Sequence, residues 1–262
     1  MRLYKYYSIV GKKRGYFLDC IGNSRLYLAS PIEFNDPFDC DVPYHLTYGG
    51  LRKLQALALI DYRYIGKVTP GKSVRDYLND PKKRDSDIVE NQEFNESIRK
   101  STLAGTLYRA RITSFCAGEV RGTDEEILMW SHYGDRHRGI CLEFDFDPSL
   151  RWLHPVSYYA QRPSFEALFE SDPSFVKSMT TKSLVWKYEH EYRIIRDRDD
   201  VHYPFRKESL KGIYFGAKAS DTDIQEMTSN VRRHGYRKIS LYKMVPSQFD
   251  FKLGQRLVTR II

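Results

Sequence analysis

The chain has 262 residues, of which 41% are hydrophobic and 29% charged, and this composition excludes a disordered or collagen-like protein. A chain of this length buries a sizeable core without disulfide bonds or a structural metal. The formal net charge of +8 favours anionic partners, namely nucleic acid, phosphorylated small molecules or acidic lipids, without choosing among them. It equally suits a soluble protein that is kept apart by its own charge.

The cysteines and the apolar stretches exclude further classes of protein. The four cysteines lie far apart and none forms a CxxC pair, so the spacing of a zinc site is absent. Apolar stretches such as residues 54–60 are too short to cross a bilayer. No signal peptide is recognisable at residue 1, so we expect free thiols in a cytoplasmic protein with no metal and no membrane contact.

The first part of the chain predicts two strands, a turn and a helix. Residues 2–9 and 25–30 have the composition of extended segments. Residues 31–43 contain three prolines and predict a turn. Apolar residues at helical spacing predict a helix over 51–63, whereas the polar and basic stretch 66–87 predicts a mobile loop or insertion.

The middle of the chain predicts a second helix over 87–109 and a strand over 110–116. Thr123 and Glu126 have the spacing of a capping box, which predicts the start of a helix over 125–133. The later elements are expected to alternate irregularly: a strand at 139–147, a helix at 163–181, strands at 184–195 and 211–217, a helix at 220–235, and extended segments at 238–246 and 251–262. This order predicts an α+β fold, with one mixed sheet flanked by helices in a single domain over residues 1–262.

Two acidic residues in a late predicted strand are the sharpest chemical feature. Glu189, Glu191 and Arg193 are two residues apart, so they share one face of a strand over 184–195. Two carboxylates side by side cost free energy unless a cation or a ligand lies between them. An ion pair of Arg193 with these carboxylates on a solvated sheet face would explain the pattern without any ligand.

Other polar groups are weaker candidates. Thr113 and Ser114 place two hydroxyls on a strand, where they would orient a ligand or bond to backbone groups. The turn FNDPFD at 34–39 favours Asx-turns over a metal or ribose site. Arg136 and Arg138 follow a predicted helix and would lie in a solvated turn or approach phosphates. The chain contains no GxSxG, Walker, GxGxxG or HExxH motif.

Several blocks together resemble a bacterial protein family. FNDPFD at 34–39, MWSHY and GICLEF within 129–144, and WKYEHEYR at 186–193 are similar to the marks of domain-of-unknown-function family 2971. The resemblance extends over most of residues 1–217. It implies a fold more than an activity.

A second resemblance, to ADP-ribosyltransferases, implies a mechanism. Those enzymes carry a basic residue on the first strand, an STS-like strand in the middle and an ExE pair on a late strand, and Glu189 and Glu191 match the pair. The resemblance implies NAD as substrate, with Glu191 stabilising the charge on the ribose and Glu189 orienting the acceptor, which would be nucleic acid or protein. It implies further residues that hold NAD: Arg2, Lys5, Tyr6, Thr113, Ser114, Tyr133, Arg136 and Arg138.

Two alternatives of other classes stay open. A metal-dependent nuclease or phosphodiesterase would use Asp36, Asp39, Glu143 and Asp145 around magnesium, because hard oxygen ligands suit that ion. A non-catalytic nucleic-acid-binding or regulatory module would use the aromatic and basic residues to bind a strand. In the sequence the Lys and Arg residues are spread out, with short clusters at 82–84 and 136–138.

Overall fold

The computed structural model covers the whole chain and describes all residues except 53–66, 70–71, 74–77, 79, 167–171 and 198–199. The chain divides into two compact units. The first comprises Met1–Ala29, Arg111–Val156 and Val185–Ile262, and the second comprises Ser30–Ala110 and Ser157–Leu184. The expectation of a single domain stays a prediction.

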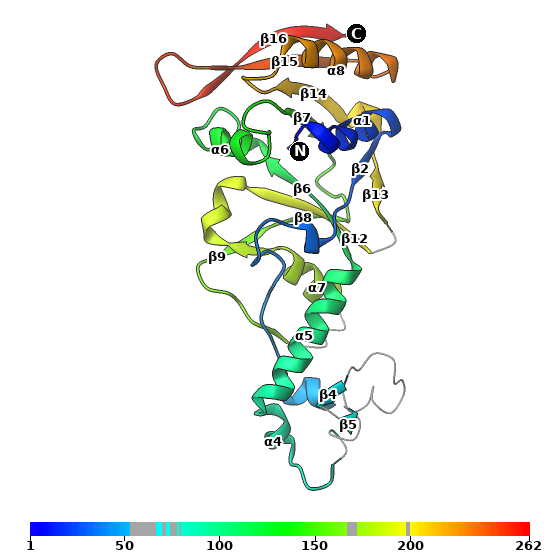
Figure 1. Cartoon of the computed structure of the whole chain (residues 1–262), viewed down its shortest axis with the longest axis vertical. Helices are drawn as coiled ribbons and strands as arrows, with labels where there is room; N and C mark the ends of the chain where they lie inside the picture. The colour runs from blue at the N-terminus through cyan, green and yellow to red at the C-terminus, as the bar shows by residue number, and fades with distance from the viewer. Residues whose placement is uncertain (53–66, 70–71, 74–77, 79, 167–171, 198–199) are drawn as a thin grey trace. The chain divides into compact units, whose positions relative to one another are not determined.

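An eight-stranded mixed sheet forms the first unit (Figure 1), which confirms the predicted α+β class. β14 and β15 run parallel, whereas β1 runs antiparallel to both β6 and β7. The strands in their order across the sheet are β16 (Leu253–Ile261), β15 (Ile239–Pro246), β14 (Leu210–Phe215), β7 (Ile140–Asp145), β1 (Arg2–Tyr7), β6 (Ala110–Ala117), β12 (Glu191–Asp197) and β8 (Leu153–Pro155).

Helices cover both faces of this sheet. On one face, α1 (Arg14–Asn23) and α8 (Asp221–Arg233) pack on a large core with sheet residues such as Leu3 and Phe144. On the other face, α6 (Glu125–His132) packs a smaller core against Tyr4 and its neighbours. The alternation of β1 explains the division, because successive side chains of a strand point to opposite faces.

The sequence pattern predicted a capping residue at the start of α6 and of α8, and the structure confirms the one at α8. Ser220 caps α8, and its hydroxyl accepts a hydrogen bond from the backbone N–H of Asp223 at 3.1 Å. The capping box predicted for α6 is wrong. The Thr123 hydroxyl donates to the carbonyl of Val120, and the Glu126 carboxylate pairs with Arg121 instead of closing the box.

Smaller elements complete the first unit. β2 (Arg25–Tyr27) and β13 (His202–Pro204) form an antiparallel pair, and Ala29 bridges to Ile112 of β6. Four short 3-10 helices lie in the connections, at η1 (Gly11–Lys13), η4 (Gly118–Val120), η5 (Leu184–Glu189) and η6 (Lys207–Ser209).

The second unit is built around α5 (Gln92–Arg109). The predicted helix over 87–109 is in fact two helices, because Asn91 accepts a hydrogen bond from the backbone N–H of Phe94 and starts a new helix after α4. The other described elements are α4 (Asp85–Val89), α7 (Asp172–Met179), η2 (Pro31–Glu33), the pair β3 (Tyr44–His45) and β10 (Phe165–Glu166), the pair β9 (Ser157–Tyr159) and β11 (Thr181–Ser183), and the pair β4 (Lys67–Thr69) and β5 (Lys72–Ser73).

Two predictions concern segments that lie partly outside the described residues. The predicted helix over 51–63 falls mostly there, as does much of the predicted insertion over 66–87. The predicted helix over 163–181 is described only from residue 172, where α7 begins, and β10 precedes it. Among the described residues, no helix is both long and apolar enough to cross a membrane.

Candidate functional site

The acidic pair lies where η5 ends and β12 begins. The predicted strand over 184–195 is wrong in its first half: residues 184–189 form the 3-10 helix η5, and the strand starts at Glu191. His190 separates the two segments with a left-handed φ of 43°. A left-handed residue turns the chain sharply, so Glu189 and Glu191 do not share a strand face as the pattern predicted.

Both acids are nevertheless buried, with Glu189 at 3% exposure and Glu191 at 5%. The Tyr133 hydroxyl, at the end of α6, donates a hydrogen bond to Glu189 Oε1 at 2.6 Å. Burial raises the pKa of Tyr133 strongly, and the charges of Glu189 and Glu191 raise it further. The phenol therefore stays protonated and is a permanent donor to Glu189.

Glu191 is held by Arg193 in a two-point contact. Arg193 Nε lies 2.7 Å from Glu191 Oε1, and its Nη2 lies 3.1 Å from Oε2. Both side chains are buried, so this is a desolvated ion pair rather than the pair on a solvated face that the sequence suggested. A planar guanidinium that matches both oxygens of a carboxylate fixes its orientation.

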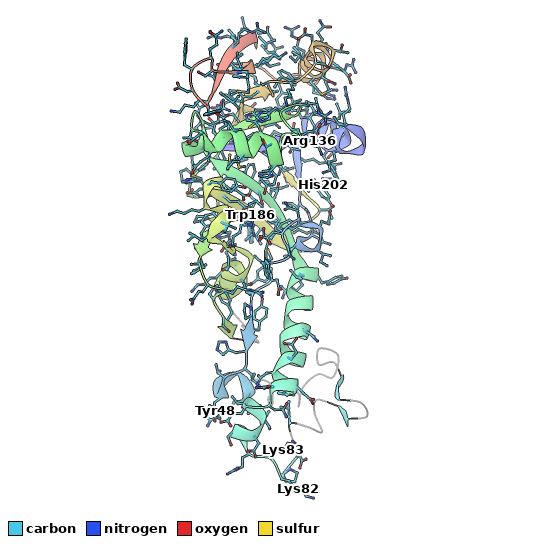
Figure 2. The ribbon with its side chains drawn as sticks, turned by 60° about the vertical axis from the view of Figure 1, so that its left-hand side comes forward. Tyr48, Lys82, Lys83, Arg136, Trp186 and His202 are labelled. Carbon is cyan, nitrogen blue, oxygen red and sulfur yellow. The ribbon has the colours of Figure 1, made fainter. Side chains whose placement is uncertain are left out.

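Aromatic side chains of η5, which directly precedes the acidic pair, contact one another and α6. Trp186 and Tyr188 of η5 contact each other with their ring centroids 6.0 Å apart. Trp186 also meets His132 of α6 edge-on at 6.3 Å, which ties η5 to α6. Figure 2 labels Trp186 on this segment. Tyr133, which donates to Glu189, and Tyr188, the neighbour of Glu189 in the chain, both pack against the smaller core.

Lys5 lies on the opposite face of β1, together with Leu3 and Tyr7. Its ammonium donates to the carbonyl of Ser114 at 3.1 Å and stands over the rings of Tyr7 and Phe115. Burial lowers the pKa of Lys5 to about 8, although the charge of Glu191 acts in the other direction. Lys5 thus contacts the backbone of Ser114 rather than its hydroxyl, and the NAD-binding role predicted for both residues stays a prediction.

Thr113 and Tyr6 each contribute a buried polar atom. In the part of the chain that the structure describes, Thr113 Oγ1 and the Tyr6 hydroxyl have no hydrogen-bonding nitrogen or oxygen. The Tyr6 ring meets Trp130 edge-on at 5.0 Å, and its hydroxyl lies beside the thiol of Cys141. Burial raises the pKa of Tyr6 well above its ordinary value.

Two of the remaining predicted cations, Arg2 and Arg138, pair with acids other than Glu189 and Glu191, and Arg138 Nη2 lies 3.4 Å from Asp135 Oδ1. Arg2 pairs with Glu143 of β7, which also accepts a hydrogen bond from Tyr214 at 2.5 Å. Arg136 and Arg138 are exposed on the loop after α6, where Figure 2 labels Arg136. Three consecutive residues of this loop, 135–137, have left-handed φ angles, which only a tightly bonded loop tolerates in residues other than glycine.

The structure gives each acid proposed for magnesium another contact. Asp36 accepts a hydrogen bond from the backbone N–H of Phe38 at 2.9 Å, which confirms the predicted Asx-turn. Asp145 pairs with the N-terminal ammonium, and Glu143 pairs with Arg2.

Asp39 of the second unit lies 3.7 Å from the buried ammonium of Lys182. Within the described residues, no group of three His, Cys, Asp or Glu side chains is arranged to hold a metal. The described residues therefore do not favour the nuclease hypothesis.

The segment that carries the tyrosine and both acids matches a known family. The model of the family described as "Protein of unknown function (DUF2971)" matches residues 129–194. This match confirms the predicted resemblance to family 2971 over about a quarter of the chain. No curated protein and no solved structure matches the chain. The resemblance to ADP-ribosyltransferases stays a prediction.

Proposed function

We propose that the chain is an ADP-ribosyltransferase-like enzyme that cleaves the nicotinamide–ribose bond of NAD and transfers the ADP-ribosyl group to an acceptor. One observation carries the proposal: the Tyr133 hydroxyl donates a hydrogen bond to buried Glu189 at 2.6 Å, and the charge of Glu191 helps to raise the pKa of the same hydroxyl. The acids of the predicted motif are both buried, and one of them contacts a tyrosine at the end of α6, which supports the proposal. The acceptor, nucleic acid or protein, stays open.

The chemistry explains why such a reaction needs a carboxylate. When the bond breaks, its electron pair goes to the pyridinium nitrogen, nicotinamide leaves as a neutral molecule, and the ribose ring becomes positively charged. A fixed negative charge next to the ring lowers the free energy of that transition state. The acceptor oxygen or nitrogen then bonds to the ribose, and its proton passes to a carboxylate.

The contacts favour catalytic roles for Glu189 and Glu191 that differ from those the motif implies. Both carboxylate oxygens of Glu191 accept hydrogen bonds from the guanidinium of Arg193, so the positive charge of Arg193 largely neutralises the charge of Glu191. The Tyr133 phenol donates a hydrogen bond to Glu189 Oε1 and thereby orients this carboxylate. We therefore assign the charge-stabilising role to Glu189 and treat Glu191 with Arg193 as positioning residues.

Two of the other predicted NAD-binding residues, Arg136 and Arg138, keep a place in the proposal. Arg136 and Arg138 are exposed cations of the first unit and would pair with the diphosphate, Arg138 by giving up its exposed contact with Asp135 at 3.4 Å. Lys5 is left out of the assignment, because it lies on the face of β1 opposite to α6 and Tyr133. Arg2 is excluded from the assignment, because it pairs with Glu143.

The test measures the release of nicotinamide from NAD by the full-length chain, with the transfer of labelled ADP-ribose as a second readout. We expect turnover by the unaltered chain and a loss of about a hundredfold or more in kcat for Glu189→Gln. Tyr133→Phe keeps the ring, removes the donor, and should lower kcat about tenfold. Glu208→Gln changes an exposed carboxylate of the same unit and is the matched control.

Two results would contradict the proposal. The first is the absence of NAD turnover and of NAD binding in the unaltered, folded chain. The second is unchanged turnover in Glu189→Gln. A thermal unfolding curve for each variant shows whether a loss of activity comes from a loss of fold.

A further inference from the structure

The positive charge of the chain is concentrated at its C-terminal end. Residues 231–262 contain eight of the 42 Lys and Arg residues but one of the 34 Asp and Glu residues. These 32 residues therefore carry +7 of the net charge of +8, and the other 230 residues are nearly neutral. The cations are spread along the chain, as the sequence indicates, but the acids that would balance them are scarce in this segment.

This segment forms one continuous part of the first unit. It contains the end of α8 and the two strands β15 and β16, and β16 is an outer strand of the sheet (Figure 1). Seven of its eight cations have exposed side chains: Arg232, Arg233, Arg237, Lys238, Lys252, Arg256 and Arg260. Nearly the whole of this charge thus faces solvent.

Lys243, the eighth and partly buried cation of the segment, forms what we call the helix-side strip together with the exposed Arg232 and Arg256. Lys243 of β15 lies directly opposite Arg256 of β16 in the antiparallel register. Arg232, in the last turn of α8, donates to the hydroxyl of Thr259 at 3.4 Å, which places it beside β16 on the same face. Lys243 approaches Asp221 at 3.6 Å, the one acidic contact of the strip among the described residues.

A cross-strand pair of like charges costs free energy. Lys243 and Arg256 occupy such a pair, and a bound anion between them would relieve the repulsion. Phosphate groups are the anions that lysine and arginine bind best when several act together. The register thus gives an observation, independent of the overall charge count, that points to a polyanion.

The turn that joins β15 and β16 holds two aromatic rings in solvent. Phe249 is 92% exposed and Phe251 is 90% exposed. The turn is nevertheless well bonded, because the Ser247 hydroxyl accepts from the backbone N–H groups of Phe249 and Asp250 at 3.2 Å. A backbone bond between Ser247 and Lys252, at 2.9 Å, closes the turn. Two exposed rings on an ordered turn cost free energy unless they stack on a partner.

We propose that the helix-side strip and the Phe249–Phe251 turn bind single-stranded nucleic acid. The cations would follow the phosphates, and the two rings would stack on unpaired bases, which duplexes do not expose. An anionic membrane would also attract cations and aromatic rings. It is less suited, because Asp250 stands between the two rings and its carboxylate would be carried into the headgroup layer.

The experiment measures binding of a fluorescein-labelled 20-nucleotide oligo(dT) to the full-length chain by anisotropy, over a series of salt concentrations. Binding of single strands weakens with salt, with a slope of about 0.7 for each phosphate contact. Arg232→Gln with Arg256→Gln should therefore weaken binding about tenfold or more and reduce the slope by about 1.4. Lys82→Gln with Arg84→Gln removes the same charge from the loop before α4, near the Lys82 label of Figure 2, and should change neither quantity.

Separate variants test the stacking of bases on the two phenylalanine rings of the turn. Phe249→Ala and Phe251→Ala should each weaken oligo(dT) binding about fivefold or more and leave the salt slope unchanged. Phe38→Ala, an exposed ring of the second unit, is the control and should have no effect.

Three results would overturn the proposal. They are no binding of oligo(dT) at low salt, equal binding of a duplex that does not depend on either Phe, and Phe-dependent binding to phosphatidylserine vesicles without binding to oligo(dT). None of these results bears on NAD turnover, which Glu189→Gln tests separately.

Discussion

Replacing Lys5 with Met tests whether the ammonium of Lys5, in the middle of the sheet, is shielded from water as the structure indicates. Lys5 is a half-buried residue on the α1 side of β1, and its ammonium lies over the rings of Tyr7 and Phe115. The ammonium donates a hydrogen bond to the carbonyl oxygen of Ser114. Met has nearly the same length and no charge, so the variant removes the ammonium with little change in packing.

The magnitude follows from the pKa of Lys5. Burial lowers this pKa from 10.5 to about 8, so the folded chain holds the proton less tightly than the unfolded chain. Between pH 8 and 10.5 the unfolded chain binds more protons, and the stability contributed by Lys5 therefore rises with pH. One pKa unit corresponds to about 1.4 kcal/mol, so the gain from pH 7 to pH 10 is about 2.5 kcal/mol.

The assay is urea unfolding of the unaltered chain and of Lys5→Met at pH 7, 8, 9 and 10, followed by tryptophan fluorescence. Other groups also titrate in this range, but they are common to both proteins and cancel in the difference between the two free energies of unfolding. We expect Lys5→Met to be favoured most at pH 7. Its advantage should shrink by about 2.5 kcal/mol by pH 10.

A difference that does not change between pH 7 and pH 10 would refute the reasoning. It would mean that Lys5 keeps the pKa of a solvated lysine, and hence that water reaches its ammonium. A difference that changes in the opposite direction would mean that a carboxylate stabilises the charged form more strongly than burial destabilises it.

Three further predictions concern the acidic pair and the loop after α6. His190 has a left-handed φ, so His190→Gly should be more stable than His190→Ala by about 1 kcal/mol in urea unfolding. Arg193→Met leaves Glu191 without its two-point partner and should cost about 3 kcal/mol or more, whereas adding Glu191→Gln should recover part of this loss in a double-mutant cycle. In Gly139→Ala the new methyl group would overlap the carbonyl oxygen of Tyr7, so the midpoint of thermal unfolding should fall by several degrees.

The parts of the fold that follow from local pattern were predictable. Strand β7 alternates in sequence and lies where the alternation predicted it, and Ser220 starts α8 as its spacing with Asp223 indicated. In both cases the signal lies within a few neighbouring residues. The resemblance of the MWSHY and WKYEHEYR blocks to family 2971 was likewise readable, because each block is a short contiguous run.

The arrangement of the candidate site was less predictable, because its contacts join distant parts of the chain. Tyr133 and Glu189 are 56 residues apart, and no spacing rule relates them. The same-face position of Glu191 and Arg193 was predicted correctly from the strand period, and their pairing was one of the alternatives left open. Their burial was not predictable, because it depends on which elements cover β12.

The left-handed residue between the acids connects the two halves of the candidate site. The His190 N–H donates to the carbonyl of Lys187 at 3.1 Å, and the His190 carbonyl accepts from the N–H of Ala117 at 3.0 Å. A residue keeps a strained conformation only where its surroundings impose it. The hydrogen bond from Ala117 of β6 to His190 therefore helps to set the orientation of the neighbouring Glu189 side chain. Because the same strand offers the Ser114 carbonyl to Lys5, a shift of β6 would move the acids and the ammonium together.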